Sequence, residues 1–171
     1  MAILDDLRDR GVWYELLLHR PASCSTRRAG LMKLPGRIVA KAVLVQARDS
    51  ALVAVLPATR SIDLDRLSAV LGLERSEVRL ATEDEAARVF RDCEAGVVPA
   101  FGRLYGLKTI VDDEFARLPI VVFGANSRHE AVRMRFADFA SLERPFLASF
   151  TCPIDIRTPV ARRSRGGRRA G

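Results

Sequence analysis

The sequence predicts an α/β domain with a mixed sheet, and three observations support this fold class. Two apolar, β-rich runs, 38–47 and 52–56, are separated by the polar residues 48–50, which is typical of a β-hairpin. Residues 63–71 carry leucine and valine at helical spacing. Residues 82–85 read Thr-Glu-Asp-Glu, the pattern of a capping box at a helix start. Because hairpins and helices alternate along the chain, they belong to one α/β fold.

The first third of the chain predicts two short helices and a strand. A helix over 3–11 ends at a glycine, and an apolar, aromatic strand follows over 12–18. After a loop, Ser25 or Thr26 can cap a second short helix, which the Pro-Gly pair at 35–36 stops.

The middle of the chain holds the two clearest helix signals. Asp63 is a predicted cap for the helix over 63–71, and Gly72 ends that helix. In the capping box, the Thr82 hydroxyl can accept from the Glu85 amide while the Glu85 side chain reaches back. A helix to about residue 90 should follow.

The last third predicts a loop, three strands and a helix. Glycine and proline make residues 92–106 a turn-rich loop. Short buried strands are expected at 109–111 and 120–123. Residues 131–136 alternate apolar side chains with arginine, as in a strand with one buried face. A last short helix contains residues 139–142.

Length and composition favour one domain over 1–156, followed by a flexible basic tail over 157–171. The chain has 171 residues, of which 49% are apolar and 29% charged, enough for a core and a hydrated surface. No apolar run reaches the ~18–20 residues of a membrane span, and the acidic start is not that of a secretory signal. Three widely spaced cysteines favour neither a disulfide framework nor a zinc site, so we expect the reducing cytoplasm.

The basic excess is concentrated in the tail. Five arginines lie in the last ten residues, and without them 23 basic residues face 21 acidic ones, so a net charge of +7 falls to +2. The tail can contact phosphates without reading sequence, or it can simply keep the protein soluble. If the arginines made this a general RNA-binding protein, deleting residues 160–171 would change tRNA affinity and its salt dependence.

Several kinds of active site are absent from the sequence. There is no GxSxG nucleophile elbow and no P-loop, and the two histidines are not at a metal-binding spacing. We therefore expect neither a metal nor another cofactor. A site would have to work through backbone dipoles, a charged side chain and groups of the substrate itself.

Three places could form such a site. Lys41 is an ammonium in an otherwise apolar strand, where it could anchor a phosphate or ribose, or could only protect a sheet edge from aggregation. Only three of 28 basic residues are lysine, which adds a mild hint of function. The loop 96–102, with two glycines and Pro99, could present amides to an oxyanion or be an ordinary connection. His129, in the turn 124–129, could hold a water or be a bystander.

Taken in order, these segments resemble the YbaK/prolyl-tRNA-synthetase-associated domain family, free-standing relatives of the editing (INS) domain of bacterial prolyl-tRNA synthetase. The similarity runs from about residue 4 to residue 150, and its most specific part is Asp-Cys-Glu-Ala-Gly-Val-Val-Pro-Ala-Phe-Gly at 92–102. The segment at 19–26, the strand bearing Lys41 and the run 131–139 continue the pattern. The resemblance implies a mixed, mostly antiparallel, curved sheet surrounded by helices.

The resemblance also implies an activity: hydrolysis of the ester of aminoacyl-tRNA that carries the wrong amino acid. The family's lysine falls on Lys41, which would position the terminal adenosine and its phosphate. Its GxxP loop falls on Gly96 and Pro99, which would hold the α-amino group and carbonyl through backbone atoms. A water assisted by a ribose hydroxyl would attack, without a metal or a side-chain nucleophile. The implied catalytic residues are Lys41, Gly96, Pro99 and His129, and the candidate substrate-binding residues are Val97, Val98, Phe101, Gly102, Leu44, His19 and Thr26.

Two departures from the family pattern bear on the site. Close relatives often have a second proline where this chain has Ala100, so the loop could be looser. The turn 124–129 is longer than usual, which leaves open whether Arg128 or His129 occupies the family's histidine position.

The expected partner is the acceptor end of an aminoacyl-tRNA, and a synthetase could deliver it. A small amino acid such as alanine or cysteine, on the tRNA for proline, is the expected substrate, although the sequence does not distinguish among small amino acids. The alternative is a non-catalytic module that binds aminoacyl-tRNA or a nucleotide, since this fold also occurs within larger regulatory proteins.

Overall fold

The computed structural model describes residues 3–154 of the chain. The predicted boundary between residues 156 and 157 and the predicted flexible tail lie outside these residues, so both stay predictions. No helix within 3–154 is long and apolar enough to cross a membrane.

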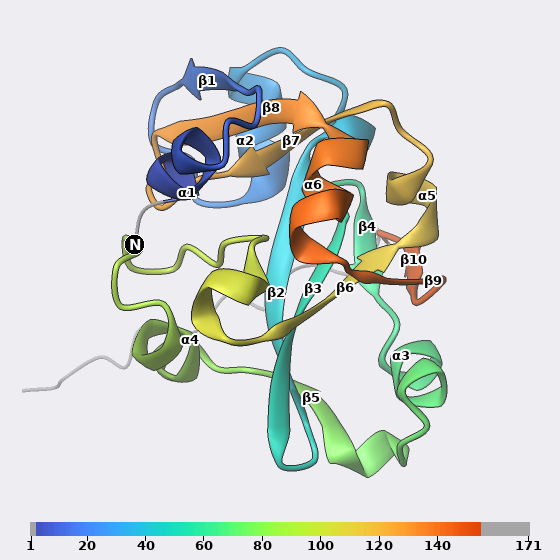
Figure 1. The fold of residues 1–171 in the computed structure, drawn as a ribbon. Helices are drawn as coiled ribbons and strands as arrows, with labels where there is room; N and C mark the ends of the chain where they lie inside the picture. The colour runs from blue at the N-terminus through green and yellow to red at the C-terminus, as the bar shows by residue number, and fades with distance from the viewer. Residues whose placement is uncertain (1–2, 155–171) are drawn as a thin grey trace, which may run out of the picture.

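The described residues form short helices and strands that alternate along the chain, and Figure 1 shows their arrangement. The α-helices are α1 (Ile3–Asp9), α2 (Ser25–Leu31), α3 (Leu64–Leu71), α4 (Glu83–Val89), α5 (Asp113–Ala116) and α6 (Phe136–Glu143). The strands are β1 (Glu15–Leu18), β2 (Ala40–Ala47), β3 (Ser50–Pro57), β4 (Arg60–Ile62), β5 (Val78–Leu80), β6 (Lys108–Asp112), β7 (Ile120–Gly124), β8 (Glu130–Arg135), β9 (Phe146–Ala148) and β10 (Thr151–Pro153).

The strands form three sheets, in the orders β5-β2-β3-β6-β9, β1-β8-β7 and β10-β4. Only the pairs β3–β6 and β6–β9 are parallel, which confirms a mixed, mostly antiparallel arrangement. A single parallel bridge between Val39 and Val122 links the two larger sheets. In Figure 1, β2 and β3 run from the β1–β8–β7 sheet at the top to their turn at the bottom.

The predicted hairpin is present. Ala47 pairs with Ser50 across a two-residue turn, and Arg48 takes a positive φ of 53° there. The Arg48 side chain is tied to Glu77 by an ion pair of 2.6 Å between Nε and Oε1. In this register Lys41 lies opposite Leu56, near the end of β2 that is far from the turn.

Two of the three predicted helix caps are confirmed. The Asp63 carboxylate accepts from the amides of residues 65 and 66, each at 3.1 Å, and Thr82 and Glu85 form the capping box. The prediction for α2 is wrong. Its N-cap is Cys24, which makes no capping bond, while the Thr26 hydroxyl donates to the Ala58 carbonyl at 3.2 Å.

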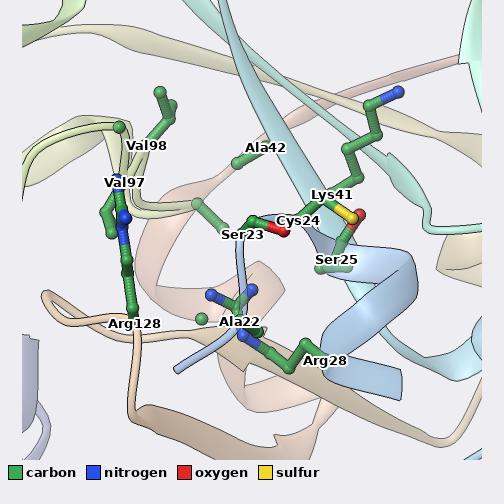
Figure 2. Close-up of a pocket in the computed structure, with 14 residues that line it drawn as sticks. Ala22, Ser23, Cys24, Ser25, Arg28, Lys41, Ala42, Val97, Val98 and Arg128 are labelled. Atoms are coloured by element: carbon green, nitrogen blue, oxygen red, sulfur yellow. The ribbon is translucent and has the colours of Figure 1, made fainter. Parts of the chain in front are cut away.

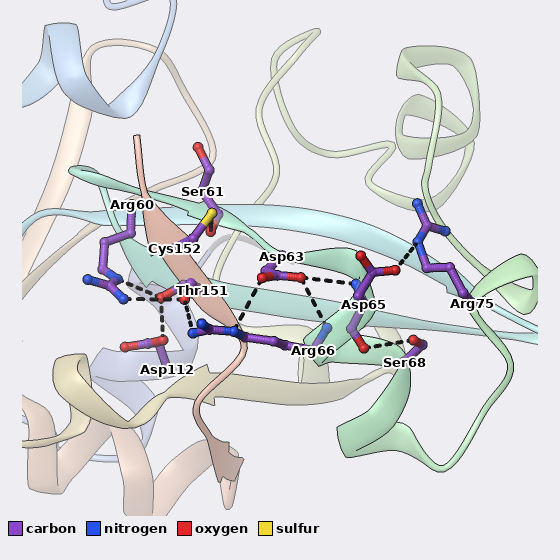
Figure 3. A network of polar contacts seen from close by, with 10 residues as sticks. All are labelled: Arg60, Ser61, Asp63, Asp65, Arg66, Ser68, Arg75, Asp112, Thr151 and Cys152. Carbon is purple, nitrogen blue, oxygen red and sulfur yellow. Dashed lines mark hydrogen bonds and ion pairs between the residues drawn. The ribbon is translucent and has the colours of Figure 1, made fainter. Parts of the chain in front are cut away.

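A polar network secures the small β4–β10 sheet (Figure 3). The hydroxyl of Thr151, a fully buried residue, donates to the Asp112 carboxylate at 2.7 Å and accepts from Arg60 Nε at 2.6 Å. Arg66 from α3 donates to the Thr151 carbonyl at 3.2 Å. The network therefore joins α3, β4, β6 and β10 at one buried threonine.

The main core is an aromatic cluster between the two larger sheets and α6. The rings of Phe123 and Phe139 stack with centroids 4.3 Å apart, and Phe101 meets both of them edge-on. All three side chains are fully buried. Edge-to-face and offset contacts of this kind add to the hydrophobic gain from burial.

We expect Phe139→Ala to lower the free energy of unfolding by about 3–5 kcal/mol, because it removes the ring at the centre of this cluster and leaves a cavity. Denaturant unfolding followed by circular dichroism measures the change. Phe146→Ala is the matched control, since Phe146 is 57% exposed. Its effect should stay within about 0.5 kcal/mol, and equal effects of the two substitutions would contradict the assignment of the core.

Candidate active site

A cavity of about 180 Å³ lies where α2, the start of β2, the loop 96–100 and the end of β7 meet. Figure 2 shows it with Arg128 and Val97 along one side and Lys41 extending past Cys24 on the other. The lining residues are Ala22, Ser23, Cys24, Ser25, Arg28, Ala40, Lys41, Ala42, Gly96, Val97, Val98, Ala100, Gly124 and Arg128. They include three cations and no carboxylate, so the cavity suits a ligand with negative charge.

Lys41 supplies one of these cations. Its side chain is half-buried, and burial lowers the pKa of the ammonium because desolvation disfavours the charged form, while nearby Cys24 partly raises it. Among the described residues no carboxylate forms an ion pair with it. A compact ammonium held in this way is available to an anion that enters the cavity.

The loop 96–98 forms the opposite wall through its backbone. Gly96 has a φ of 80°, a conformation that other residues rarely adopt. A Cβ at this position would lie 3.0 Å from Nη2 of Arg128, so a side chain would also crowd the arginine. Glycine therefore allows the loop to bring main-chain atoms, rather than side chains, against a ligand.

Arg128 and Glu94 hold this loop to the turn 124–129. The Glu94 amide donates to the Asn126 carbonyl at 2.8 Å, and the Glu94 carboxylate accepts from the Arg128 amide at 2.8 Å. The Arg128 guanidinium donates through Nε to the Ala95 carbonyl at 3.1 Å. Two segments about 30 residues apart in the chain are thus joined by main-chain and charged contacts.

The Asn126 side chain completes this connection. Its Oδ1 accepts from the Ile3 amide at 2.8 Å, and its Nδ2 donates to the Cys93 sulfur and to the Tyr105 hydroxyl, each at 3.3 Å. Burial raises the pKa of the Cys93 thiol, so the sulfur stays protonated at neutral pH. Asn126 therefore fastens α1, the loop at 93 and the 3-10 helix at 102–105 to the same turn.

Sequence reasoning missed Arg28, which reaches the cavity from α2. Arg28 is 9% exposed, and desolvation lowers the pKa of its guanidinium, while Cys24 partly raises it. In the sequence it is one of 25 arginines, in a segment without a recognisable motif.

Several predicted site residues do lie together. Lys41, Gly96, Val97 and Val98 all line the cavity, although Lys41 is far from the other three in the sequence. Pro99 follows them directly but is buried behind the wall. Their roles in binding or catalysis stay predictions.

Three other predicted residues are in the core rather than at the cavity. Phe101 packs between Phe123 and Phe139, and Leu44 is 2% exposed on the inward face of β2. Gly102 is buried where a Cβ would lie 2.6 Å from the Thr109 hydroxyl. These residues support the wall from behind.

The remaining predicted residues also lie apart from the cavity lining. His129 is exposed and its carbonyl accepts from the His19 amide at 2.9 Å, so the two histidines connect the turn to β1 through their backbones. His19 Nδ1 contacts the Arg20 carbonyl at 2.7 Å. The Thr26 hydroxyl is hydrogen-bonded to the Ala58 carbonyl. Gly124 and Arg128 line the cavity from this turn, and His129 does not.

No group of three or more His, Cys, Asp or Glu within residues 3–154 is placed to hold a metal ion.

Comparisons with known proteins identify related chains and folds. A family model described as "Aminoacyl-tRNA editing domain" matches residues 19–142. No curated protein matches the sequence significantly. Among solved structures, a "hypothetical protein" has a TM-score of 0.78 at 16% identity, covering 87% of this chain and 98% of its own. A "putative trans-editing enzyme for prolyl tRNA synthetase" has a TM-score of 0.71 at 18% identity, covering 86% and 93%.

A third similar structure comes from a longer protein. A "putative signal transduction protein" from Marinobacter aquaeolei VT8 has a TM-score of 0.68 at 20% identity, covering 87% of this chain but 30% of its own. At these identities the three structures show the fold, which confirms the predicted fold class.

We expect the Lys41 ammonium to lose its proton at a lower pH than the ordinary 10.5 of lysine, because the half-buried site disfavours the charged form. Reductive ¹³C-methylation followed by NMR titration measures this, since the chain has only three lysines. Lys41→Arg assigns the signal by removing it. A midpoint at or above 10.5 would contradict the proposed desolvation.

Asn126→Ala should loosen the connection between the two loops and lower the free energy of unfolding by about 1–3 kcal/mol, because buried hydrogen-bonding partners lose their contacts. Hydrogen exchange should accelerate at the amides of Glu94 and Val97. Ser127→Ala is the control, since among residues 3–154 the Ser127 hydroxyl bonds only to Glu130 and to the His129 amide, both close to it in sequence. Unchanged exchange in Asn126→Ala would show that the loops are held in another way.

Proposed function

Because this chain belongs to the aminoacyl-tRNA editing domain family, we propose that it is a trans-editing hydrolase of mischarged aminoacyl-tRNA. The proposed substrate is alanine, cysteine or a similar small amino acid esterified to tRNA, with the tRNA for proline as first candidate. The neighbour described as a trans-editing enzyme for prolyl tRNA synthetase supports that choice of tRNA. The proposal implies the cytoplasm, where aminoacyl-tRNA is made and used, and a synthetase as a second partner.

One observation carries the proposal: Lys41 and the Gly96–Val98 backbone face the same cavity from separate parts of the fold. The substrate has both groups that such a cavity would need to bind. Its phosphate and ribose would lie toward the ammonium, and its α-amino group and carbonyl toward the loop. Small side chains on the remaining walls leave room for a small amino acid.

The proposed reaction needs no side-chain nucleophile. A water oxygen adds to the ester carbonyl carbon, the bond from that carbon to the ribose oxygen breaks, and the ribose oxygen takes the proton. The neighbouring ribose hydroxyl orients the water. The contribution of the protein is to fix the ester against the glycine loop and to stabilise developing negative charge with main-chain amides and nearby cations.

We assign the family's histidine position to Arg128 rather than His129. Arg128 lines the cavity and holds the Ala95 carbonyl, whereas His129 is exposed. Arg128 would then maintain the shape of the loop. Ala100, the other departure from the family pattern, lines the cavity and is 2% exposed, so it would shape the amino-acid pocket.

A non-catalytic module that binds aminoacyl-tRNA or a nucleotide is the second candidate. The similar fold that occupies 30% of a chain described as a signal transduction protein favours it, because there the fold is part of a larger molecule. Turnover of any aminoacyl-tRNA by the purified protein separates the two candidates.

We expect wild-type protein to hydrolyse at least one of alanyl-, cysteinyl- and seryl-tRNA for proline, and Lys41→Met to reduce the rate by about 100-fold or more through loss of positioning. Deacylation of labelled substrate measures the rate, and circular dichroism verifies folding. Lys33→Met is the matched control, because Lys33 is exposed and does not line the cavity. Full activity of Lys41→Met would refute its role, and folded wild type that hydrolyses nothing would favour the binding module.

A further inference from the structure

Arg28 is a buried guanidinium without a counter-ion. It is 9% exposed, and its Nε has no hydrogen-bond partner among the described residues. No described carboxylate pairs with it. Figure 2 shows the guanidinium rising from α2 toward the middle of the cavity.

Other partly buried arginines of this protein are paired. Arg103 contacts Asp6 at 2.6 Å, and Arg60 contacts Glu114 at 3.4 Å and the Thr151 hydroxyl at 2.6 Å. Removing a cation from water is costly unless an anion and hydrogen bonds replace the lost hydration. Arg28 has no such replacement among the described residues, and an anionic ligand in the cavity would supply one.

The position of the guanidinium is built into the fold. A Cβ on Gly124, at the end of β7, would lie 2.6 Å from Nη1 and 2.9 Å from both Cζ and Nη2 of Arg28. The flat group therefore lies directly against the backbone of Gly124, where any larger residue would displace it. Contact with Gly124 fixes the plane of the guanidinium, and the N–H groups at its edge stay available to a ligand. Bidentate recognition of an oxyanion requires this arrangement.

The surroundings also suit an anion. Lys41 lines the same cavity, and no acidic residue does. Much of the wall consists of small residues such as Ala22, Ala40 and Ala42. A volume of about 180 Å³ is roughly ten times what one water needs, which is enough for a carboxylate or phosphate group.

We propose that Arg28 binds an anionic group of the substrate, a phosphate of the acceptor end or a carboxylate on the aminoacyl side chain, in the cavity that Lys41 also lines. The identity of the ligand rests on the proposed function, but oxyanion binding itself can be tested without turnover. Arg28 would then decide which substrates the cavity prefers. An acidic side chain, if selected, would extend the substrate range beyond small neutral amino acids.

Four non-hydrolysable probes separate the two sources of the anion. They are 3′-amide analogues of aminoacyl-adenosine, carrying alanyl or aspartyl groups, each with and without a 5′-phosphate. Calorimetry measures Kd for the full-length wild type, Arg28→Met and Arg27→Met. Arg27 is the matched control because it is exposed on the same helix and does not line the cavity.

In the wild type and in Arg27→Met, one of the two anionic additions should tighten binding at least tenfold, and Arg28→Met should abolish that gain. A gain from the 5′-phosphate identifies the acceptor end, and a gain from the aspartyl group identifies the side chain. The alanyl probe without a 5′-phosphate, which carries neither anion, should bind all three proteins alike. A gain that survives in Arg28→Met, or binding of the alanyl probe with no gain from either anion, would overturn the proposal.

A titration with inorganic phosphate distinguishes failure of this proposal from failure of the proposed function. The NMR signals of Arg28 Nε and the Gly124 amide report binding. Phosphate binding at Arg28 with no binding of any adenosine probe would leave the anion site standing and refute the proposed function. Binding of the alanyl probe without a 5′-phosphate, with no phosphate binding and no anionic gain, would refute the anion site and leave the proposed function standing. Gly124→Ala, which keeps the charge but displaces the guanidinium, should lose the gain as Arg28→Met does.

Discussion

The cavity depends on one constraint, the attachment of the loop 93–98 to the turn 124–129. The two segments are separated by about 30 residues of chain, and apart from Gly124, the last residue of β7, neither lies in a helix or strand. They are joined by hydrogen bonds of Glu94, by the Asn126 side chain, which donates to the Cys93 sulfur, and by the guanidinium of Arg128. Because these contacts are made by polar groups outside the cavity lining, apart from Arg128, they hold the wall without covering its backbone. The aromatic core supports this wall from behind through Phe101, which directly follows Ala100, the last residue of the loop that lines the cavity.

The electrostatics of the site oppose its stability in the absence of a ligand. Arg28 and Lys41 are brought out of water without carboxylate partners among the described residues, and desolvation lowers the pKa of both groups. A folded domain tolerates this cost only if the rest of the structure supplies enough stability, here the aromatic core and the network around Thr151. The same desolvation cost is the basis of recognition. An oxyanion that binds in the cavity offsets it by pairing with the buried cations, and a neutral molecule does not.

The sequence predicted well those elements that are determined by interactions between residues close together in the chain. Asp63 and Thr82 cap helices through side chains that lie within three residues of their partners, and Gly72 ends α3 in a left-handed conformation. The short strands β4, β5, β9 and β10 were missed, because three residues carry no measurable alternation and each pairs with a strand distant in sequence. The predicted cap of α2 was wrong because the Thr26 hydroxyl donates a hydrogen bond to Ala58, a tertiary contact.

The sequence by itself determined the fold class and the family, and it singled out Lys41 and the glycine loop because both are unusual in their local setting. It could not say which residues share a cavity. Leu44 and Phe101 have the apolar character of pocket residues yet lie in the core, while Arg28 and Arg128 resemble the other arginines of a basic chain. Only the tertiary structure decided which cations leave water and which face a carboxylate, because that depends on segments brought together from opposite ends of the chain.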